Sequence, residues 1–484
     1  MAHILKSKES LIPLGLGIAA VLFYTPFLLR GFICDDILWI ANARIAMDNP
    51  SHYLSRAMYG YFRPLNMVAV SVLYKLFGLN PFLFSFFAKL VHGINVMLLF
   101  VVCRRLNLSV VLASMASIFF AFYVVNSSAI FYISTLHDLM MVTSLLIFTL
   151  LLLKFLETSH IAYGIALVAV GLAATLLKEA GFMSIALYFV IPPLITGRFP
   201  RSRNYYVVGA LLTIFFASYL IYYFATRVHA DRELSYSLNI LKNLWYAIVF
   251  AFMPTTERII PPSNAPLIQA LKIAKVVFTI GLIPAFLYVF RRGESGVRVM
   301  IAWMFLLLLP TSLFNWKFHL FSLYPESTMT RFMYVAIPGI AVFVAWIIER
   351  ILPARKSWPV WSAVVGIGLL FLVINFVGCK KVFGYYHFKS NLVNTLVSQL
   401  ETVSDDYSDI SKITIFTSDM QRTEQEISTS QITSSLYWLY YNKRISFETI
   451  EDSLENAHFS HPGHLYLRWD PDNQKLIFPE DHHL

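Results

Sequence analysis

The sequence predicts an all-α polytopic membrane protein with a small α/β domain at its C-terminal end, and three observations support this. The chain is 57% hydrophobic and only 14% charged, whereas soluble domains carry about 25% charged residues. Apolar segments long enough to cross a bilayer recur as far as Val377. Beyond that point the chain is polar and has the patterning of an ordinary globular domain.

The hydropathy pattern indicates about eleven membrane-spanning helices. They are Leu11–Leu29, Phe82–Cys103, Leu108–Val125, Leu139–Phe155, Ile161–Leu177, Gly181–Ile195, Tyr205–Phe224, Leu267–Phe290, Val297–Phe314, Phe332–Ile348 and Trp358–Val377. Two further apolar stretches, Pro64–Phe77 and Ile240–Met253, are short and begin or end near proline. We therefore expect those two to be interfacial or re-entrant helices.

Basic residues gather in alternate short segments, which predicts that these segments face the cytoplasm. They are Lys6 and Lys8, Arg104 and Arg105, Arg198 to Arg203, Arg291 to Arg298, and Arg350 to Lys356. All lie on one side only if Pro64–Phe77 does not cross the bilayer. The N-terminus is then cytoplasmic, and the first long loop and the C-terminal tail lie outside. The net charge of +10 is largely this signal, so it indicates no nucleic-acid partner.

The change in composition divides the chain into a transmembrane domain, residues 1–379, and an extracytoplasmic α/β domain, residues 380–484. In the second, Lys412–Thr417 has the pattern of a strand and Gln425–Tyr441 that of a helix. His464–Trp469 and Lys475–Phe478 flank an Asp-Pro-Asp-Asn turn and predict a β-hairpin.

Asp35 and Asp36 are the strongest candidate catalytic residues. They follow the first predicted span by a few residues, and a carboxylate at a membrane costs little only if it faces water or a polar cavity. The pair therefore predicts a catalytic carboxylate at the mouth of a membrane-embedded site. The alternative is an N-cap for a helix that begins at Ile37. Adjacent side chains diverge, so only one of the two can point fully into a site.

The rest of the first outer loop supports such a site. The spacing of apolar residues over Ile37–Met47 predicts an amphipathic helix at the membrane surface. It could cover a cavity between the spans. Arg63, just before Pro64, is a candidate phosphate ligand because arginine binds phosphate in a bidentate way. The alternative is an arginine whose head group reaches the membrane surface.

Other polar residues lie at predicted outer span ends. His137 and Asp138 line the same cavity or, in the case of Asp138, cap a helix. Lys178 and Glu179 contact substrate or form a surface ion pair with each other. Arg331 begins an arginine–aromatic segment and suits a lipid phosphate, although aromatic residues also form interfacial belts. No spaced histidine motif such as HExxH occurs, so the sequence predicts no metal site. Three cysteines are too few for a disulfide framework.

In this order, these motifs resemble the GT-C glycosyltransferases, and most of all the membrane half of the tetratricopeptide-containing O-mannosyltransferases and their bacterial relatives. In that group DD begins the first outer loop, as Asp35-Asp36 does, and an asparagine follows, as Asn42 does. A YRPL-like step matches Phe62-Arg63-Pro64-Leu65. A stretch like HPVHTEAVAWISGRADLL aligns with Tyr123–Leu139, where Asp138 matches but Asn126 and Ser128 replace the family's residues.

Two later steps complete the resemblance, which covers residues 11–350. A Lys-Glu step matches Lys178-Glu179, and an RYLYLP-like step matches Arg331–Pro338 with a shifted proline, which brings in Tyr334. The chain has no repeats of tetratricopeptide period. The resemblance implies a GT-C-like fold and a hexosyltransferase, similar to mannosyltransferases, that uses a polyprenyl-phosphate sugar donor in the bacterial plasma membrane. Its active site is expected to face outward.

The implied chemistry fits the candidate residues. A carboxylate, Asp35 or Asp36, takes a proton from an acceptor on a protein, lipid or glycan, and the acceptor attacks the anomeric carbon. By analogy with the DE and DD motifs of similar enzymes, we favour Asp35. The lipid phosphate leaves, and Arg63, Lys178 or Arg331 stabilises its charge. This chemistry requires no cofactor, and the sequence leaves open whether a divalent metal ion takes part. The main alternative is a lipid or solute transporter or flippase. Such proteins often show paired halves, and the sequence has no internal symmetry.

Overall fold

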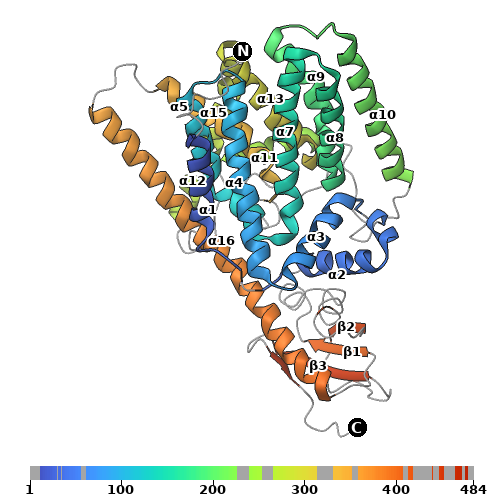
Figure 1. Ribbon diagram of the computed structural model, residues 1–484. Helices are drawn as coiled ribbons and strands as arrows, with labels where there is room; N and C mark the ends of the chain where they lie inside the picture. The colour runs from blue at the N-terminus through green and yellow to red at the C-terminus, as the bar shows by residue number, and fades with distance from the viewer. Residues whose placement is uncertain are drawn as a thin grey trace.

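The computed structural model describes residues 11–29, 31–33, 35–55, 61–225, 239–252, 265–312, 331–351, 358–406, 412–417, 439, 446–451, 464–470 and 475–477. Figure 1 shows a bundle of long helices with a small sheet at its lower end. The helices α2 and α3 lie at that same end, between the bundle and the sheet (Figure 1).

The helices of the bundle are α1 (Leu11–Tyr24), α4 (Pro81–Arg105), α5 (Val110–Phe122), α7 (Leu136–Thr158), α8 (Ile161–Leu177), α9 (Met183–Thr196), α10 (Arg203–Ala225), α11 (Asn239–Phe252), α12 (Ala265–Arg292), α13 (Ser295–Ser312), α15 (Ile337–Ile351) and α16 (Trp358–Asp406). A helix of the bundle overlaps each of the eleven predicted spans, and α11 overlaps the stretch Ile240–Met253, which was expected to be interfacial or re-entrant. Within the described residues, six helical segments are long and apolar enough to cross a membrane, or seven if a pair bent by 47° after Phe122 counts as one span. The chain is thus a multi-pass membrane protein, and the count of eleven spans stays a prediction.

The helix boundaries follow from local sequence signals. α4 begins after Asn80, whose side-chain oxygen accepts the N–H of Leu83 at 3.3 Å, and proline occupies its first turn. It ends at Arg104 and Arg105, whose charge suits the C-terminal end of a helix dipole. The short helix α3 spans Pro64–Phe77, with the bounds that the sequence predicts, and Gly78 at its end has a φ of +58°.

A pair of glycines lets α1 approach α4 closely. A Cβ atom on Gly93 would lie 2.9 Å from the carbonyl oxygen of Gly17, and one on Gly17 would lie 2.6 Å from the side chain of Met97. Small residues allow such contacts between membrane helices. This contact fixes the position of α1, and the chain that leaves α1 leads directly to Asp35.

The basic helix ends lie together. Arg105 at the end of α4 lies 3.9 Å from Glu157 of α7, and Arg350 of α15 lies 3.6 Å from Glu294, just before α13. These ends are at the opposite end of the bundle from α2 and α3 (Figure 1). Of the basic segments that the structure describes, the ends of α4 and α15 therefore lie at one end of the molecule, as the predicted topology requires.

The C-terminal segment contains a four-stranded sheet of order β2-β1-β3-β4. β1 (Lys412–Thr417) pairs in parallel with β2 (Ser446–Glu451) and β3 (His464–Asp470), and β3 pairs antiparallel with β4 (Lys475–Ile477). The predicted strand at Lys412–Thr417 and the predicted hairpin are confirmed. The predicted helix over Gln425–Tyr441 lies outside the described residues except for Leu439. α16 continues to Asp406 without a break, so the predicted domain boundary after residue 379 falls inside a helix.

The helix predicted over Ile37–Met47 exists, but its predicted amphipathic character is wrong. α2 spans Asp35–Asp48, and the six consecutive residues from Asp36 to Ala41 are all buried. A helix lying on a lipid surface would bury only one face. α2 is covered on more than one side because α3 packs against it and Arg44 donates a hydrogen bond of 3.5 Å to the carbonyl of Leu439.

Candidate active site

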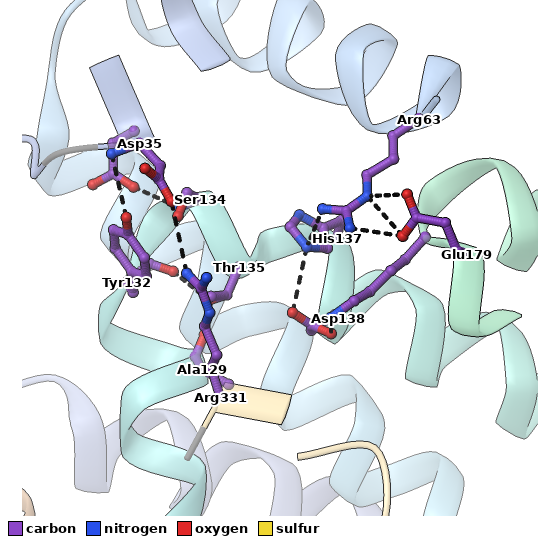
Figure 2. Close-up of polar contacts among 12 residues, drawn as sticks. Asp35, Arg63, Ala129, Tyr132, Ser134, Thr135, His137, Asp138, Glu179 and Arg331 are labelled. Atoms are coloured by element: carbon purple, nitrogen blue, oxygen red, sulfur yellow. Dashed lines mark hydrogen bonds and ion pairs between the residues drawn. The ribbon is translucent and has the colours of Figure 1, made fainter. Parts of the chain in front are cut away.

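Most of the polar residues that the sequence singles out lie, together with Tyr132, in two neighbouring groups at the α2–α3 end of the bundle (Figure 2). The first group contains Asp35, Tyr132 and Arg331. The second contains Arg63, His137, Asp138, Lys178 and Glu179. Both groups use the segment Tyr123–Leu139, which is broken into short helical turns: η2 (Val124–Asn126), α6 (Ser127–Phe131) and η3 (Ile133–Thr135). Because this segment is broken, its side chains point in several directions at one level of the bundle.

Asp36 holds the backbone together and does not face a cavity. It is 1% exposed, and its carboxylate accepts the backbone N–H of Ile33 at 3.0 Å and of Ser134 at 2.5 Å. Burial raises the pKa of Asp36 well above its usual value, and these two N–H donors oppose the shift. The side chain therefore ties the start of α2 to η3, which is a structural task.

Asp35 is the accessible carboxylate of the pair. Its side chain is 25% exposed, and its Oδ2 lies 3.8 Å from Nη1 of Arg331. Its backbone N–H donates to the hydroxyl oxygen of Tyr132 at 3.2 Å. The geometry thus separates the two aspartates: Asp36 is buried, whereas Asp35 remains partly exposed beside a guanidinium group.

Arg331 lies among aromatic rings. Its guanidinium carbon is 5.4 Å from the ring centre of Tyr132 and 5.0 Å from that of Phe332, distances suited to cation–π attraction. Burial alone would lower the pKa of Arg331, but Tyr132 and Asp35 outweigh it and the net direction is upward. The guanidinium therefore stays charged, and its side chain is still 19% exposed.

In the second group, Arg63 is bound by Glu179. Nε of Arg63 donates to Oε1 of Glu179 at 2.9 Å, and Nη2 donates to Oε2 at 2.7 Å (Figure 2). Burial alone would lower the pKa of Arg63, but the Glu179 carboxylate outweighs it and the net direction is upward. This bidentate pair occupies the donors that the sequence suggested for phosphate.

His137 contacts one side chain from each of the two ion pairs of this group. Nη1 of Arg63 donates to Nε2 of His137 at 3.1 Å. A guanidinium has only donors, so this nitrogen must be an acceptor and the imidazole is neutral. Oδ2 of Asp138 lies 3.4 Å from the same nitrogen. Because that nitrogen accepts from Arg63, it has no proton to donate to Asp138, and this second contact is not a hydrogen bond.

Asp138 and Lys178 form a buried ion pair. Their side chains are 1% and 7% exposed, and Nζ of Lys178 donates to Oδ1 of Asp138. Burial lowers the pKa of Lys178, while Asp138 opposes the shift. Two alternatives from the sequence are thus wrong. Asp138 does not cap α7, and Lys178 and Glu179 do not pair with each other, because they diverge to different partners.

Two other predicted site residues lie away from these groups. The hydroxyl of Tyr334 is bonded to Nδ1 of His92 at 2.9 Å and to Nδ2 of Asn95 at 3.0 Å, in the buried part of the bundle. Asn42 donates to the carbonyl of Leu38 and contacts Nε2 of His52 at 3.0 Å. Neither side chain meets Asp35 or Arg331 through a hydrogen bond in the described part of the chain.

The three candidate phosphate ligands, Arg63, Lys178 and Arg331, differ in their distance to a carboxylate. Lys178 and Arg63 each have a carboxylate at hydrogen-bonding distance, whereas within the described ranges the carboxylate nearest to Arg331, that of Asp35, is at 3.8 Å. Lys178 and Arg331 contact the same ring, since Nζ of Lys178 lies 4.5 Å from the ring centre of Phe332. Among the described residues, no cluster of three or more histidine, cysteine, aspartate or glutamate side chains suits a metal ion.

Tyr132 and Ser134 were not singled out from the sequence, although both hold an aspartate of the pair. The signal available was their place in the segment that aligns with the family's conserved stretch. Lys89 was missed as well. It is fully buried in α4, where it donates to the carbonyl and hydroxyl oxygens of Ser85 at 3.1 and 2.8 Å.

Comparison with solved structures identifies the fold. The chain is similar to ArnT from Cupriavidus metallidurans bound to undecaprenyl phosphate, with a TM-score of 0.50 and 12% identity over 90% of this chain and 85% of that one. It is also similar to two structures of the oligosaccharyltransferase from Archaeoglobus fulgidus. One is AglB in complex with an inhibitory peptide and a dolichol-phosphate, with a TM-score of 0.48 and 10% identity over 90% of this chain. The other is tethered to an acceptor peptide, with a TM-score of 0.49 and 11% identity over 92%.

This chain spans 64% of each of the two oligosaccharyltransferase chains. No protein-family model matches the sequence, and no curated protein does. The chain shares the fold of ArnT, in agreement with the membrane-transferase fold that the resemblance implies.

Proposed function

We propose that the protein is a glycosyltransferase that moves a sugar from a polyprenyl-phosphate donor to an acceptor at the outer face of the membrane. The observation that carries the proposal is the pairing of a partly exposed carboxylate, Asp35, with a partly exposed guanidinium, Arg331, at 3.8 Å. Both lie at one end of a GT-C fold. The similar ArnT structure contains undecaprenyl phosphate, which supports a lipid phosphate as the donor group.

In the proposed displacement, Asp35 acts on the incoming acceptor and Arg331 acts on the leaving phosphate. Asp35 takes the proton of an acceptor hydroxyl or amine, and the acceptor atom forms a bond to the anomeric carbon of the sugar. The bond from that carbon to the phosphate oxygen breaks, with inversion, and its electron pair leaves with the lipid phosphate. Arg331 stabilises the charge that develops on the phosphate.

The second group supports the first. Lys178 is neutralised by Asp138 and Arg63 by Glu179, so we assign them to fixing the shape and potential of the pocket wall. Lys178 contacts the ring of Phe332, and the same ring contacts Arg331, the proposed partner of the donor phosphate. We propose a hexose as the transferred sugar, on the resemblance to mannosyltransferases. The acceptor is a protein, lipid or glycan.

Mass spectrometry of glycans and glycolipids tests the proposal in a deletion strain. The strain is complemented with wild type, with Asp35→Asn, or with an empty vector. Loss of one hexose from a glycan or glycolipid, restored by wild type but not by Asp35→Asn, is the expected result. If both complement equally, Asp35 is not the base. If no glycan loses a sugar while a lipid-linked sugar accumulates in one leaflet, the protein is a flippase.

We also propose that the N-terminus is cytoplasmic and that the α2–α3 end faces outward. Alkaline phosphatase fused after Leu484 of the full chain is active only outside the cytoplasm, so an active fusion is expected. An inactive phosphatase fusion together with a fluorescent cytoplasmic reporter at the same point would reverse the topology.

A further inference from the structure

We propose that Tyr386 of α16 is a positioning residue that acts through Tyr132 to hold Asp35 and Arg331 in their relative places. The inference rests on the proposed function, because that function gives Asp35 and Arg331 their roles. It adds the C-terminal helix α16 to the machinery of the site, although Tyr386 touches neither of the two reacting groups.

Tyr132 contacts both halves of the site with one side chain. Its hydroxyl oxygen accepts the backbone N–H of Asp35 at 3.2 Å, and its ring faces the guanidinium of Arg331 at 5.4 Å (Figure 2). The residue lies between α6 and η3 with an extended backbone, φ −88° and ψ 111°. A single extended residue between two helical turns has no regular helix to hold its ring. The direction of that ring therefore depends on what packs against it.

Tyr386 is the ring that packs there. The two rings are stacked, with centroids 5.8 Å apart and planes at 25°. Tyr386 is 4% exposed, and its side chain hydrogen-bonds that of Ser128 in α6. Tyr386 is thus fixed on its own side, and Tyr132 is held between Tyr386 and Arg331.

α16 also contacts the chain that leads to Asp35. A Cβ atom on Gly31 would come within 2.5 Å of Oδ1 of Asn394 and 2.8 Å of the carbonyl oxygen of Ser390. One helix therefore supports the Asp35 backbone at two points, directly near Gly31 and indirectly through Tyr386. Since α16 continues from the bundle to within a few residues of β1, it is a rigid support for both.

The expected loss of turnover follows from the length of the tyrosine side chain. The hydroxyl lies at the far end of the ring, so a rotation of about 10–20° at its base is enough to leave the productive geometry. A displacement of about 1 Å at a reacting group can cost about 100-fold in rate. Loss of the stacked ring should therefore reduce turnover without removing any group that touches substrate.

Amide hydrogen exchange of the detergent-purified full chain tests the contact independently of activity. We expect Tyr386→Ala and Tyr386→Leu to speed exchange in peptides covering residues 31–38 by about tenfold, whereas Tyr386→Phe keeps the stack and exchanges as wild type. His387→Ala is the matched control, because His387 stacks on Phe383 and contacts Asn391, away from Tyr132. Tyr386→Leu keeps the apolar volume and covers the case in which Tyr386→Ala fails to fold.

Transfer kinetics with a polyprenyl-phosphate hexose donor in nanodiscs give the second readout. Tyr386→Leu is expected to lower kcat by about 10- to 100-fold with a change in donor KM below about threefold. If Tyr386 acts through Tyr132, the double variant Tyr132→Ala/Tyr386→Leu should be no slower than Tyr132→Ala alone. Two effects that multiply would overturn the inference. Unchanged exchange over residues 31–38 would do so as well, even if wild type transfers no sugar and the proposed function falls.

Discussion

The two polar groups at the α2–α3 end both contain oppositely charged side chains but differ in burial and in the distance between the charges. In the Arg63–Lys178 group, each of the two cations is bonded to a carboxylate, and the Asp138–Lys178 pair is buried. In the Asp35–Arg331 group, the two ions are 3.8 Å apart and both side chains remain partly exposed. A substrate can reach partly exposed side chains without breaking a buried ion pair, which would leave a buried charge without its partner. The Asp35–Arg331 group is therefore the better place for chemistry.

The largest effect is expected from breaking the buried pair in the Arg63–Lys178 group. Asp138→Asn leaves the Lys178 charge buried without its partner, which should cost about 3–5 kcal/mol of stability. Thermal unfolding of the purified protein measures this. The double variant Asp138→Asn/Lys178→Met removes both charges and should recover most of the loss. If the single variant is as stable as wild type, the pair is not structural and Asp138 has to be tested as a substrate ligand.

The second largest effect concerns Asp35. Asp35→Asn keeps the size of the side chain and removes its charge, so turnover should fall about 100-fold or more if Asp35 is the general base. Its stability should change little because the carboxylate is partly exposed. Initial rates and thermal unfolding measure the two outcomes.

Asp36→Asn is the matched variant one residue away. It leaves one of two backbone N–H donors without an acceptor oxygen, and it should cost about 1–3 kcal/mol of stability. Loss of turnover in Asp36→Asn at full stability, together with normal turnover in Asp35→Asn, would exchange the two roles.

The third effect is the loss of the phosphate partner. Arg331→Ala should weaken binding of a polyprenyl-phosphate donor by about 1.5–3 kcal/mol, the worth of a charge-assisted hydrogen bond. Arg331→Lys keeps the charge but not the planar donor geometry, so it should retain part of the affinity. Equilibrium binding in nanodiscs measures both. Donor binding by Arg331→Ala at the wild-type level would show that Arg331 only anchors the interface, and Lys178 would then be the better candidate.

The sequence predicted the fold well because the bilayer imposes a simple rule on composition. Span-length apolar segments and basic ends identify the bundle, and Pro64 and Gly78 mark the ends of α3. The acidic pair drew attention to the α2–α3 end because charge near a membrane is costly, and its catalytic role stays a prediction. For the choice between Asp35 and Asp36, the residues alone show only that neighbouring side chains diverge, so that one of the two can point fully into a site.

The sequence could not predict contacts between residues that are far apart in the chain. Lys178 and Glu179 are adjacent and opposite in charge, so the sequence suggested that they pair, but each finds a partner in a distant segment. Asp138 lies at the start of a span and looked like a cap for the same reason. The stacking of Tyr386 on Tyr132 joins residues about 250 positions apart, and no periodicity or motif in one sequence indicates such a contact.

The smallest effect is expected at Asn42, where the family motif and the structure suggest different tasks. The motif position implies a substrate ligand, but the side chain contacts the Leu38 carbonyl and Nε2 of His52. Asn42→Ala removes one partly exposed side-chain contact, worth about 0.5–1.5 kcal/mol, and His52→Ala removes the other half of the same pair. If the role is structural, both variants should lower the unfolding temperature slightly and equally, and both should keep kcat/KM within about threefold of wild type. A loss of more than about tenfold in Asn42→Ala alone would show that the asparagine reaches substrate, and the reacting region would then extend along α2 beyond the Asp35–Arg331 group.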